Sequence, residues 1–294
     1  MLVSFLSIIF VRQSNLILKT GISFPLVASS ILTAILCFVS LLIHELAHAL
    51  RAINIGISVK RINLVFLKQA IDLEELPRSP KEEFTVAMAG PLINLIIAII
   101  LYGVMIISAK FVPGLYQQHL ILLTLFYLAI ANTLIASFNF LPGFPMDGGR
   151  MLRSAIWTIN KNKMKATEIV IWTGRIAAIF IVMTILLRIP NLATIIFMIV
   201  VVPLIFYAGP AELRLLQTRG KLELAKVSDF MKTTTQDYLE SWQTEHLKVA
   251  IYCEANDSLW SAWQTMRQKK VGRIFVKQRG QLVGSISIVQ IYKV

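Results

Sequence analysis

The most chemically specific part of the sequence is the short motif HELAH, at residues 44–48. On an α-helix, positions i and i+4 lie on one face about one turn apart, so His44 and His48 can offer two imidazole nitrogens to one metal ion. Glu45 lies beside them and can accept or deliver a proton. Two of the four histidines of the chain fall in this motif. The spacing therefore predicts a metal site equipped with an acid–base residue.

A catalytic zinc site usually has three protein ligands and one open position, so a third ligand is required. Asp147, within FNFLPGFPMDGGR at 138–150, is the best candidate. Two prolines end the preceding helix, and two glycines after the aspartate permit tight backbone geometry. Broken backbone at membrane depth is tolerated only where it lines a protein interior or a watery cavity. We therefore expect Asp147 to complete the site, with an ordinary helix cap as the alternative.

The elements that must position these residues are long apolar runs. The chain has 294 residues, of which 56% are hydrophobic and 15% are charged. Crossing a hydrocarbon core of about 30 Å requires about 20 residues of apolar helix. Such runs lie at 22–43, 85–107, 119–141, 169–187 and 191–208. A sixth apolar piece at 2–11 is shorter and is interpreted as a short or truncated first helix. The predicted fold class is an α-helical polytopic membrane protein with five to six transmembrane helices.

The net charge of +13 could indicate a nucleic-acid-binding protein, but the distribution of the charges argues against it. Of the 29 Lys and Arg, six lie in 51–83, five in 150–168 and thirteen in 209–294. An excess of positive charge is typical of loops that face the cytosol. We therefore expect these three segments in the cytosol, the loop at 108–118 on the opposite side of the membrane, and no nucleic-acid partner.

The composition changes near residue 209, where apolar runs give way to a mixed segment. Beyond residue 248 the order is strand-like VAIYC, helix-like DSLWSAWQTMRQKK, strand-like RIFVK, a turn at QRGQ and strand-like LVGSISI. This order predicts a small cytosolic α/β tail domain. We divide the chain into a transmembrane domain at 1–208, a linker at 209–224 and a tail domain at 225–294. Cys37 and Cys253 fall on opposite sides of this division, so we do not expect them to pair.

Three motifs together resemble those of the site-2 proteases, intramembrane zinc metalloproteases that include the sporulation factor protease of bacilli. The motifs are HELAHA at 44–49, EEFTVAMAGPLINL at 82–95 and FNFLPGFPMDGGR at 138–150. The resemblance covers most of residues 22–208. It implies hydrolysis of a peptide bond in or near a transmembrane segment of a membrane protein, in the manner of regulated intramembrane proteolysis.

The resemblance also implies roles for individual residues. The zinc ligands of the family fall on His44, His48 and Asp147, which implies one Zn²⁺ per chain, and its general base falls on Glu45. Its substrate-binding asparagine falls on Asn139. The proline that precedes the DG pair falls on Pro145.

Several polar residues in the spans have a simpler interpretation. A plain interhelical hydrogen bond is a serious alternative for Asn139. For Asn94, Asn132 and Thr133 we favour a role in helix packing.

The segment at 56–75 is a candidate for docking an unwound substrate, because β-branched and apolar residues gather there and an extended peptide can pair with a strand edge. The family commonly carries a Gly-Gly turn where this chain has Leu67, Lys68 and Gln69. The local shape of this element is therefore expected to differ from the family pattern.

The tail resembles a cystathionine-β-synthase-type module, the CBS domain. One repeat is recognisable at 249–292, whereas the usual ligand pocket lies between two repeats, so a homodimer formed through the tail is an open alternative. Nucleotide-binding versions carry an aspartate where Gln290 follows Ser287. Regulation or dimerisation is therefore favoured over adenine nucleotide binding, and a purely structural tail stays open.

Two other classes of protein share some of these sequence features. A transporter or channel can also place His and Asp at membrane depth, but more often shows repeat symmetry between its halves. A noncatalytic relative that binds and sequesters transmembrane clients would retain the spans and lose a ligand or Glu45, and all four positions are present. We therefore expect a zinc metalloendopeptidase in a bacterial-type cell membrane, surrounded by lipid, with its C-terminal domain in the cytosol and a transmembrane protein as substrate.

Overall fold

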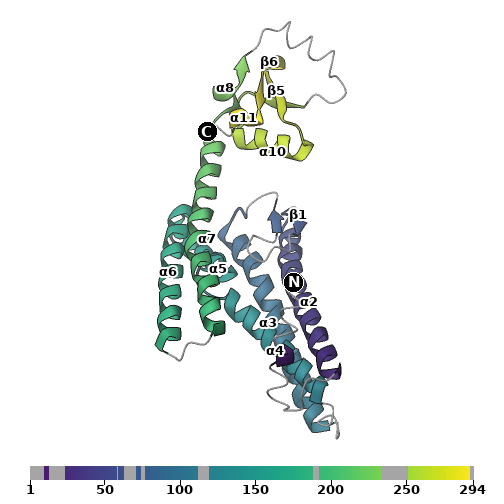
Figure 1. Ribbon diagram of the computed structural model, residues 1–294. Helices are drawn as coiled ribbons and strands as arrows, with labels where there is room; N and C mark the ends of the chain where they lie inside the picture. The colour runs from purple at the N-terminus through teal and green to yellow at the C-terminus, as the bar shows by residue number, and fades with distance from the viewer. Residues whose placement is uncertain are drawn as a thin grey trace. The chain divides into compact units, whose positions relative to one another are not determined.

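The computed structural model describes residues 10–12, 24–57, 59–62, 71–73, 77–111, 119–187, 192–233 and 251–291. They divide into two compact units, Met1–Pro210 and Ala211–Val294 (Figure 1). The first unit contains α2 (Phe24–Asn54), β1 (Val59–Ile62), β2 (Ile71–Leu73), α3 (Pro80–Phe111), α4 (His119–Asn139), α5 (Asp147–Asn160) and α6 (Lys163–Leu187). Helix α7 (Leu192–Leu224) begins in the first unit and ends in the second.

Four helices of the described chain are long and apolar enough to cross a membrane: α2, α3, α4 and α6. The predicted number of five to six is therefore not confirmed. The predicted span at 191–208 forms the first part of α7 and is not one of these four. The apolar piece at 2–11 lies outside the described residues, apart from its last two positions.

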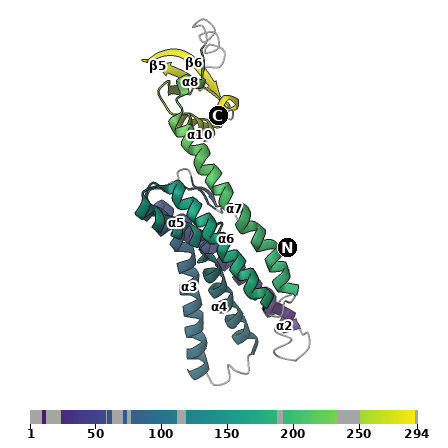
Figure 2. The ribbon, with the colours of Figure 1, turned by 90° about the vertical axis from the view of Figure 1, so that its left-hand side faces the viewer.

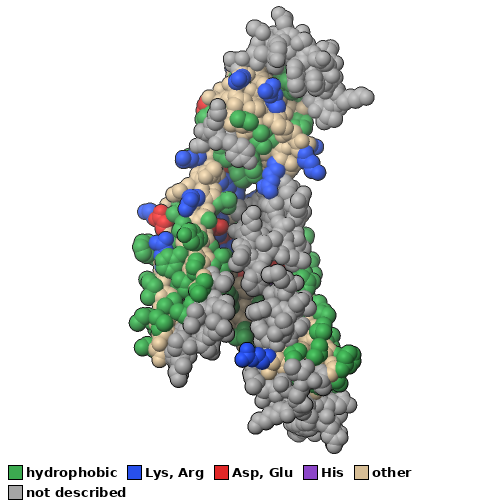
Figure 3. Space-filling model, viewed as in Figure 1, with side chains coloured by type: hydrophobic (Ala, Val, Ile, Leu, Met, Phe, Trp, Pro, Cys, Tyr) green, Lys and Arg blue, Asp and Glu red, His purple; other side chains and the backbone are tan. Residues whose placement is uncertain are grey.

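The outward faces of these helices are apolar. Ile106 on α3 is 69% exposed and Phe180 on α6 is 72% exposed. Figure 3 shows hydrophobic side chains gathered over the side of the first unit that α6 forms. Exposed apolar side chains of this density are suited to contact with lipid tails.

Helices α2, α3 and α4 pack against one another (Figures 1 and 2). Their buried faces carry small residues. Ala34, Ala98, Ala129 and Ala136 are all almost completely buried. Small side chains let helix backbones approach closely inside a membrane, where hydrophobic association between helices is weak. The close approach brings polar side chains from all three helices into contact.

The connection between α4 and α5 is compact. Residues 140–146 form successive turns, with Met146 N donating to Gly143 O at 3.1 Å. A Cβ on Gly148 would collide with the carbonyl oxygens of Phe140 and Leu141. Neither glycine of the DGG sequence has a positive φ, so glycine is needed here for close approach rather than for a left-handed backbone. The predicted tight geometry around Asp147 is present.

The pair β1 and β2 is antiparallel, with Ile62 opposite Ile71. Both strands fall in the segment predicted as a substrate-docking edge. The positions of the expected Gly-Gly turn, Leu67 to Gln69, lie outside the described residues.

The second unit is a small α/β domain. After the end of α7 come α8 (Val227–Phe230), β3 (Lys232–Thr233), β4 (Tyr252–Glu254), α10 (Leu259–Lys269), β5 (Arg273–Gln278), β6 (Gln281–Ser287) and α11 (Ile288–Ile291). The strands form one sheet in the order β3-β6-β5-β4, in which β4 and β5 are parallel and the other pairs antiparallel. Ser258 caps α10 by accepting from Ser261 N at 3.1 Å. The predicted order of strand, helix, strand, turn and strand is confirmed.

The core of this domain is apolar. Leu259 and Met266 of α10 pack with Ile274 and Val276 of β5 and with Ile286 of β6, and all five side chains are completely buried. Residues 209–224, predicted to be a linker, form the C-terminal half of α7.

Candidate metal centre

The two histidines of HELAH lie on one buried face of α2, near its C-terminal end. His44 is 3% exposed and His48 is 5% exposed. Asp147, 8% exposed, is the first residue of α5, and its carboxylate lies beside both imidazoles. One ligand atom from each of the three residues lies within 4.8 Å of the others. The structure therefore brings together the three side chains that the sequence predicted as metal ligands.

The distances between the three groups suit a single ion. His48 Nε2 lies 3.1 Å from His44 Nε2 and 3.1 Å from Asp147 Oδ2, and His44 Nε2 lies 3.2 Å from the same oxygen. Tetrahedral zinc with bonds of about 2.0 Å holds its ligand atoms roughly 3.3 Å apart. The spacing of the donors thus matches zinc with only small adjustment.

The chemistry of the donors also calls for a cation. His48 Nδ1 lies 2.7 Å from Val86 O, and a carbonyl oxygen can only accept, so Nδ1 carries a hydrogen. In the neutral ring, Nε2 then presents a lone pair toward the carboxylate of Asp147. Electron-rich atoms at 3.1 Å require positive charge between them. A proton can bridge two of the three donor atoms, whereas a metal ion can satisfy all three at once.

Space for the imidazoles is provided by Gly90 of α3. A Cβ at this position would collide with Nε2 of both His44 and His48. Val86, Gly90 and Asn94 follow one another at intervals of four residues, so they line one face of α3. Asn94 Oδ1 lies 2.5 Å from His44 Nδ1. One stripe of α3 therefore supports both imidazoles.

Glu45 is half-buried and lies next to the three donors without being one of them. It interacts electrostatically with His44, His48 and Asp147. Arg150, in the first turn of α5, interacts electrostatically with the carboxyl groups of both Glu45 and Asp147. A carboxylate in this position can exchange a proton with a group bound at the centre.

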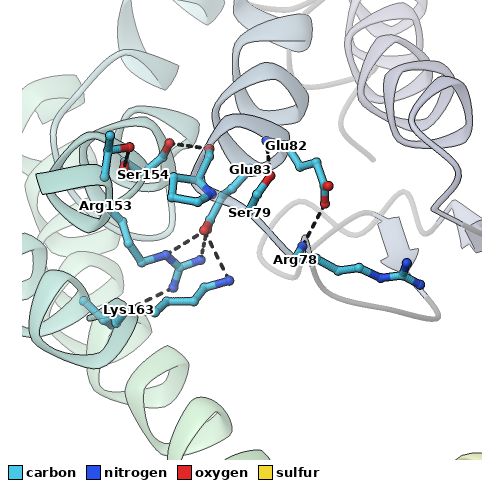
Figure 4. A network of polar contacts seen from close by, with 10 residues as sticks. Arg78, Ser79, Glu82, Glu83, Arg153, Ser154 and Lys163 are labelled. Atoms are coloured by element: carbon cyan, nitrogen blue, oxygen red, sulfur yellow. Dashed lines mark hydrogen bonds and ion pairs between the residues drawn. The ribbon is translucent and has the colours of Figure 1, made fainter. Parts of the chain in front are cut away.

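The orientation of α5, and hence of Asp147, depends on a buried ionic network (Figure 4). Arg153 of α5 donates to Glu83 of α3 through Nε, at 2.8 Å, and through Nη2, while Lys163 Nζ of α6 lies 3.2 Å from Glu83 Oε2. Ser154 Oγ donates to Pro80 O at 2.6 Å. These contacts fix α5 against the first turn of α3, just before Val86, the residue whose carbonyl contacts His48.

The two residues predicted to bind substrate lie in the α4–α5 region, outside the three-residue cluster. Asn139 is the last residue of α4 and donates through Nδ2 to Ile135 O at 3.0 Å. Pro145 is exposed and follows a cis peptide bond.

Sequence reasoning did not assign the supporting roles of Gly90, Asn94 and Asn132. The available signal was the four-residue spacing in VAMAGPLIN, which places valine, glycine and asparagine on one helix face.

The chain is similar to a known peptidase family and to known metalloproteases. A model of Peptidase family M50 matches residues 32–119 and 104–184. A Synechocystis sp. protein, provisionally named a zinc metalloprotease, is 36% identical over 148 residues, or 49% of this chain and 36% of that protein. A zinc metalloprotease of Methanocaldococcus jannaschii is 28% identical over 259 residues, or 88% of this chain and 68% of that protein.

A solved structure is also similar. The Site-2 Protease from Methanocaldococcus jannaschii is 26% identical, with a TM-score of 0.46 over 71% of this chain and 87% of that one. Among the curated relatives, the chain spans about a third of the length of the Synechocystis protein and about two thirds of the Methanocaldococcus protein.

Proposed function

The chain belongs to peptidase family M50, and from this membership we propose that it is an intramembrane zinc metalloprotease that cleaves a membrane protein in or near a transmembrane segment. Four apolar helices and the family indicate a multi-pass integral membrane protein. The observation that carries the proposal is the meeting of two imidazoles and one carboxylate within 4.8 Å, beside Glu45, on helices of this kind.

In this proposal His44, His48 and Asp147 hold one Zn²⁺. Zinc in such a site lowers the pKa of a bound water to about 7 and polarises the scissile carbonyl. The single carboxylate among the ligands leaves the site with a net positive charge, which favours both effects. Glu45 accepts the proton of the attacking water on its carboxylate and delivers it to the leaving amine.

Substrate binding is proposed for the region around the α4–α5 connection. A peptide bond inside a helix has its carbonyl occupied, so the substrate must unwind before cleavage. The antiparallel pair β1 and β2 offers an edge on which an unwound segment can dock. Asn139, at the end of α4, is proposed to donate its amide to the substrate, and the exposed Pro145 to border the same path.

The second unit is proposed to be a CBS-type module in the cytosol. Its mixed sheet and capped helix are compatible with one repeat of such a module. Gln290 accepts from Ser287 N at 2.9 Å and donates to Phe230 O at 2.8 Å, so it has a structural role where a ribose-binding aspartate would stand. Regulation or homodimerisation through this unit is therefore favoured over nucleotide binding.

The alternative is a noncatalytic protein that sequesters transmembrane clients. Zinc content and cleavage of a single-span substrate, measured in detergent, distinguish the two. The Glu45→Gln variant should hold one zinc and cleave nothing, because the base is lost and the ligands are kept. Asp147→Asn should lose both zinc and cleavage. Cleavage by Glu45→Gln at the wild-type rate would refute the assigned base, and a wild-type protein that holds zinc but cleaves nothing would favour the sequestering protein.

A further inference from the structure

A chain of buried hydrogen bonds extends from His44 away from the metal centre. His44 Nδ1 lies 2.5 Å from Asn94 Oδ1, and Asn94 Nδ2 donates to Asn132 Oδ1 at 2.7 Å. Asn132 Nδ2 donates to Leu128 O at 2.8 Å and to Ser40 Oγ at 3.1 Å. Asn94 and Asn132 are completely buried. Side chains from α2, α3 and α4 thus form one continuous polar path inside an apolar bundle.

The direction of every bond in this path follows from one backbone carbonyl. Leu128 O can only accept, so Asn132 must turn its NH₂ group toward it and its oxygen toward Asn94. Asn94 must then turn its NH₂ group toward Asn132 and its oxygen toward His44. Because that oxygen can only accept, His44 Nδ1 must carry the hydrogen.

Ser40 reinforces the same direction. Its hydroxyl donates to Leu36 O at 3.1 Å, which leaves a lone pair to accept from Asn132. Both hydrogens of the Asn132 amide are therefore used, one by α4 and one by α2. Reversing Asn132 would set its oxygen against Leu128 O, and a buried mismatch of this kind is strongly disfavoured.

We infer that Asn94 and Asn132 are positioning residues that fix the tautomer of His44, so that Nε2 presents its lone pair to the metal. The inference rests on the proposed metal centre and assigns a role to two residues that could otherwise be explained by helix packing alone. A neutral imidazole whose hydrogen sat on Nε2 would point that hydrogen at the metal position and could not bind. His48 has no need of such a path, because Val86 O fixes its tautomer directly.

Substitutions at Asn132 test this inference without altering either histidine or its immediate partner. Asn132→Leu removes the oxygen that orients Asn94, so Asn94 can reverse and His44 can carry its hydrogen on Nε2. Asn132→Asp, in its neutral form, keeps an acceptor for Asn94 and offers an O–H to Leu128 O. Thr133→Val is the matched control, because Thr133 also lies on α4 and donates to Ala129 O one turn earlier.

The first readout is the tautomer itself. The full chain, labelled with ¹⁵N-histidine and kept metal-free in detergent at a pH where imidazoles are neutral, contains four histidines. Nitrogen NMR separates a ring nitrogen that carries hydrogen from one that does not, and the His44 signals are identified by their loss in His44→Asn. We expect hydrogen on Nδ1 in wild type, Asn132→Asp and Thr133→Val, and a shift of population to Nε2 in Asn132→Leu.

The second readout is metal binding. Zinc affinity, from competition with a chelator, should fall about 10-fold to 100-fold in Asn132→Leu and stay near wild type in the other two variants. The visible spectrum of the Co²⁺-substituted protein should change only in Asn132→Leu. An unchanged tautomer together with unchanged zinc affinity in Asn132→Leu would overturn the inference. If Asn132→Leu shows the predicted tautomer shift and loss of zinc affinity while the wild type cleaves no substrate, the proposed protease activity is refuted and the inference stands.

Discussion

Replacing Gly90 by alanine tests whether the candidate metal centre depends on the absence of a side chain at this position of α3, where the two imidazoles pack. The new Cβ would lie 2.6 Å from His44 Nε2 and would also collide with His48 Nε2, whereas ordinary contacts begin at 3.4 Å. His44 Nε2 would therefore have to withdraw by about 0.8 Å, while metal–ligand distances tolerate only about 0.2 Å. We expect zinc affinity to fall by at least about 100-fold, which exceeds the usual effect of changing one supporting contact.

Gly103→Ala is the matched control for this prediction. Gly103 lies on the same helix, and a Cβ there would meet nothing within 4 Å. Both substitutions should gain up to about 1 kcal/mol of helix propensity, so a difference in zinc binding would not reflect a weaker helix. The assay is zinc affinity by chelator competition in detergent, with thermal unfolding of the metal-free proteins alongside. Equal zinc affinity in the two variants would refute the steric reasoning.

Two further predictions concern the buried ionic network and the second unit. Arg153→Met leaves Glu83 buried without its principal cation and should lower the free energy of unfolding by about 3–5 kcal/mol. Arg219→Met breaks a more exposed pair with Glu223 and should cost at most about 1 kcal/mol. Denaturant unfolding compares them, and equal losses would contradict the assigned importance of the network. In the second unit, burial, with Asp257 and Glu254 adding to it, raises the pKa of the Cys253 thiol to about 12. The folded state therefore favours the neutral thiol, so this stabilisation is complete below the ordinary pKa of 9.0 and is lost as the pH rises toward 12. Iodoacetamide at neutral pH should label Cys253 only after denaturation, and fast labelling of the native protein would count against this assignment.

The candidate metal centre could be predicted from the sequence because its proposed ligands carry their own signals. His44 and His48 have helical spacing, and Asp147 stands between helix-breaking prolines and a glycine pair. Ionisable residues at the ends of apolar helices have few explanations other than function. Each of the two motifs places polar, ionisable residues at the end of an apolar run. The three side chains that these motifs contribute lie close together in the structure.

The support around the centre could not be predicted in the same way. Asn94 and Asn132 have the sequence context of ordinary packing asparagines, and their role depends on which carbonyl fixes each amide. Gly90 has meaning only because two imidazoles face it. These are properties of contacts between helices, and one sequence does not specify which helix faces are adjacent.

The secondary structure of residues 209–224 was not predicted from the sequence. The change of composition at residue 209 indicated a linker, whereas α7 continues to Leu224 through Pro203 and Pro210. The sequence after Pro210 is rich in leucine, lysine, arginine and glutamate, which favour helix. A shift from apolar to charged residues marks a change of environment and does not by itself end a helix.

The two histidines differ in what holds them, and this difference affects how the centre can change by mutation. His48 is oriented by the main-chain carbonyl of Val86, an acceptor that a change of side chain at that position does not remove. His44 is oriented by an asparagine side chain, which a single codon change can remove or replace. Mutation can therefore change the metal affinity gradually by altering the side chain that orients His44. The orientation of His48, which depends on the main chain, stays the same.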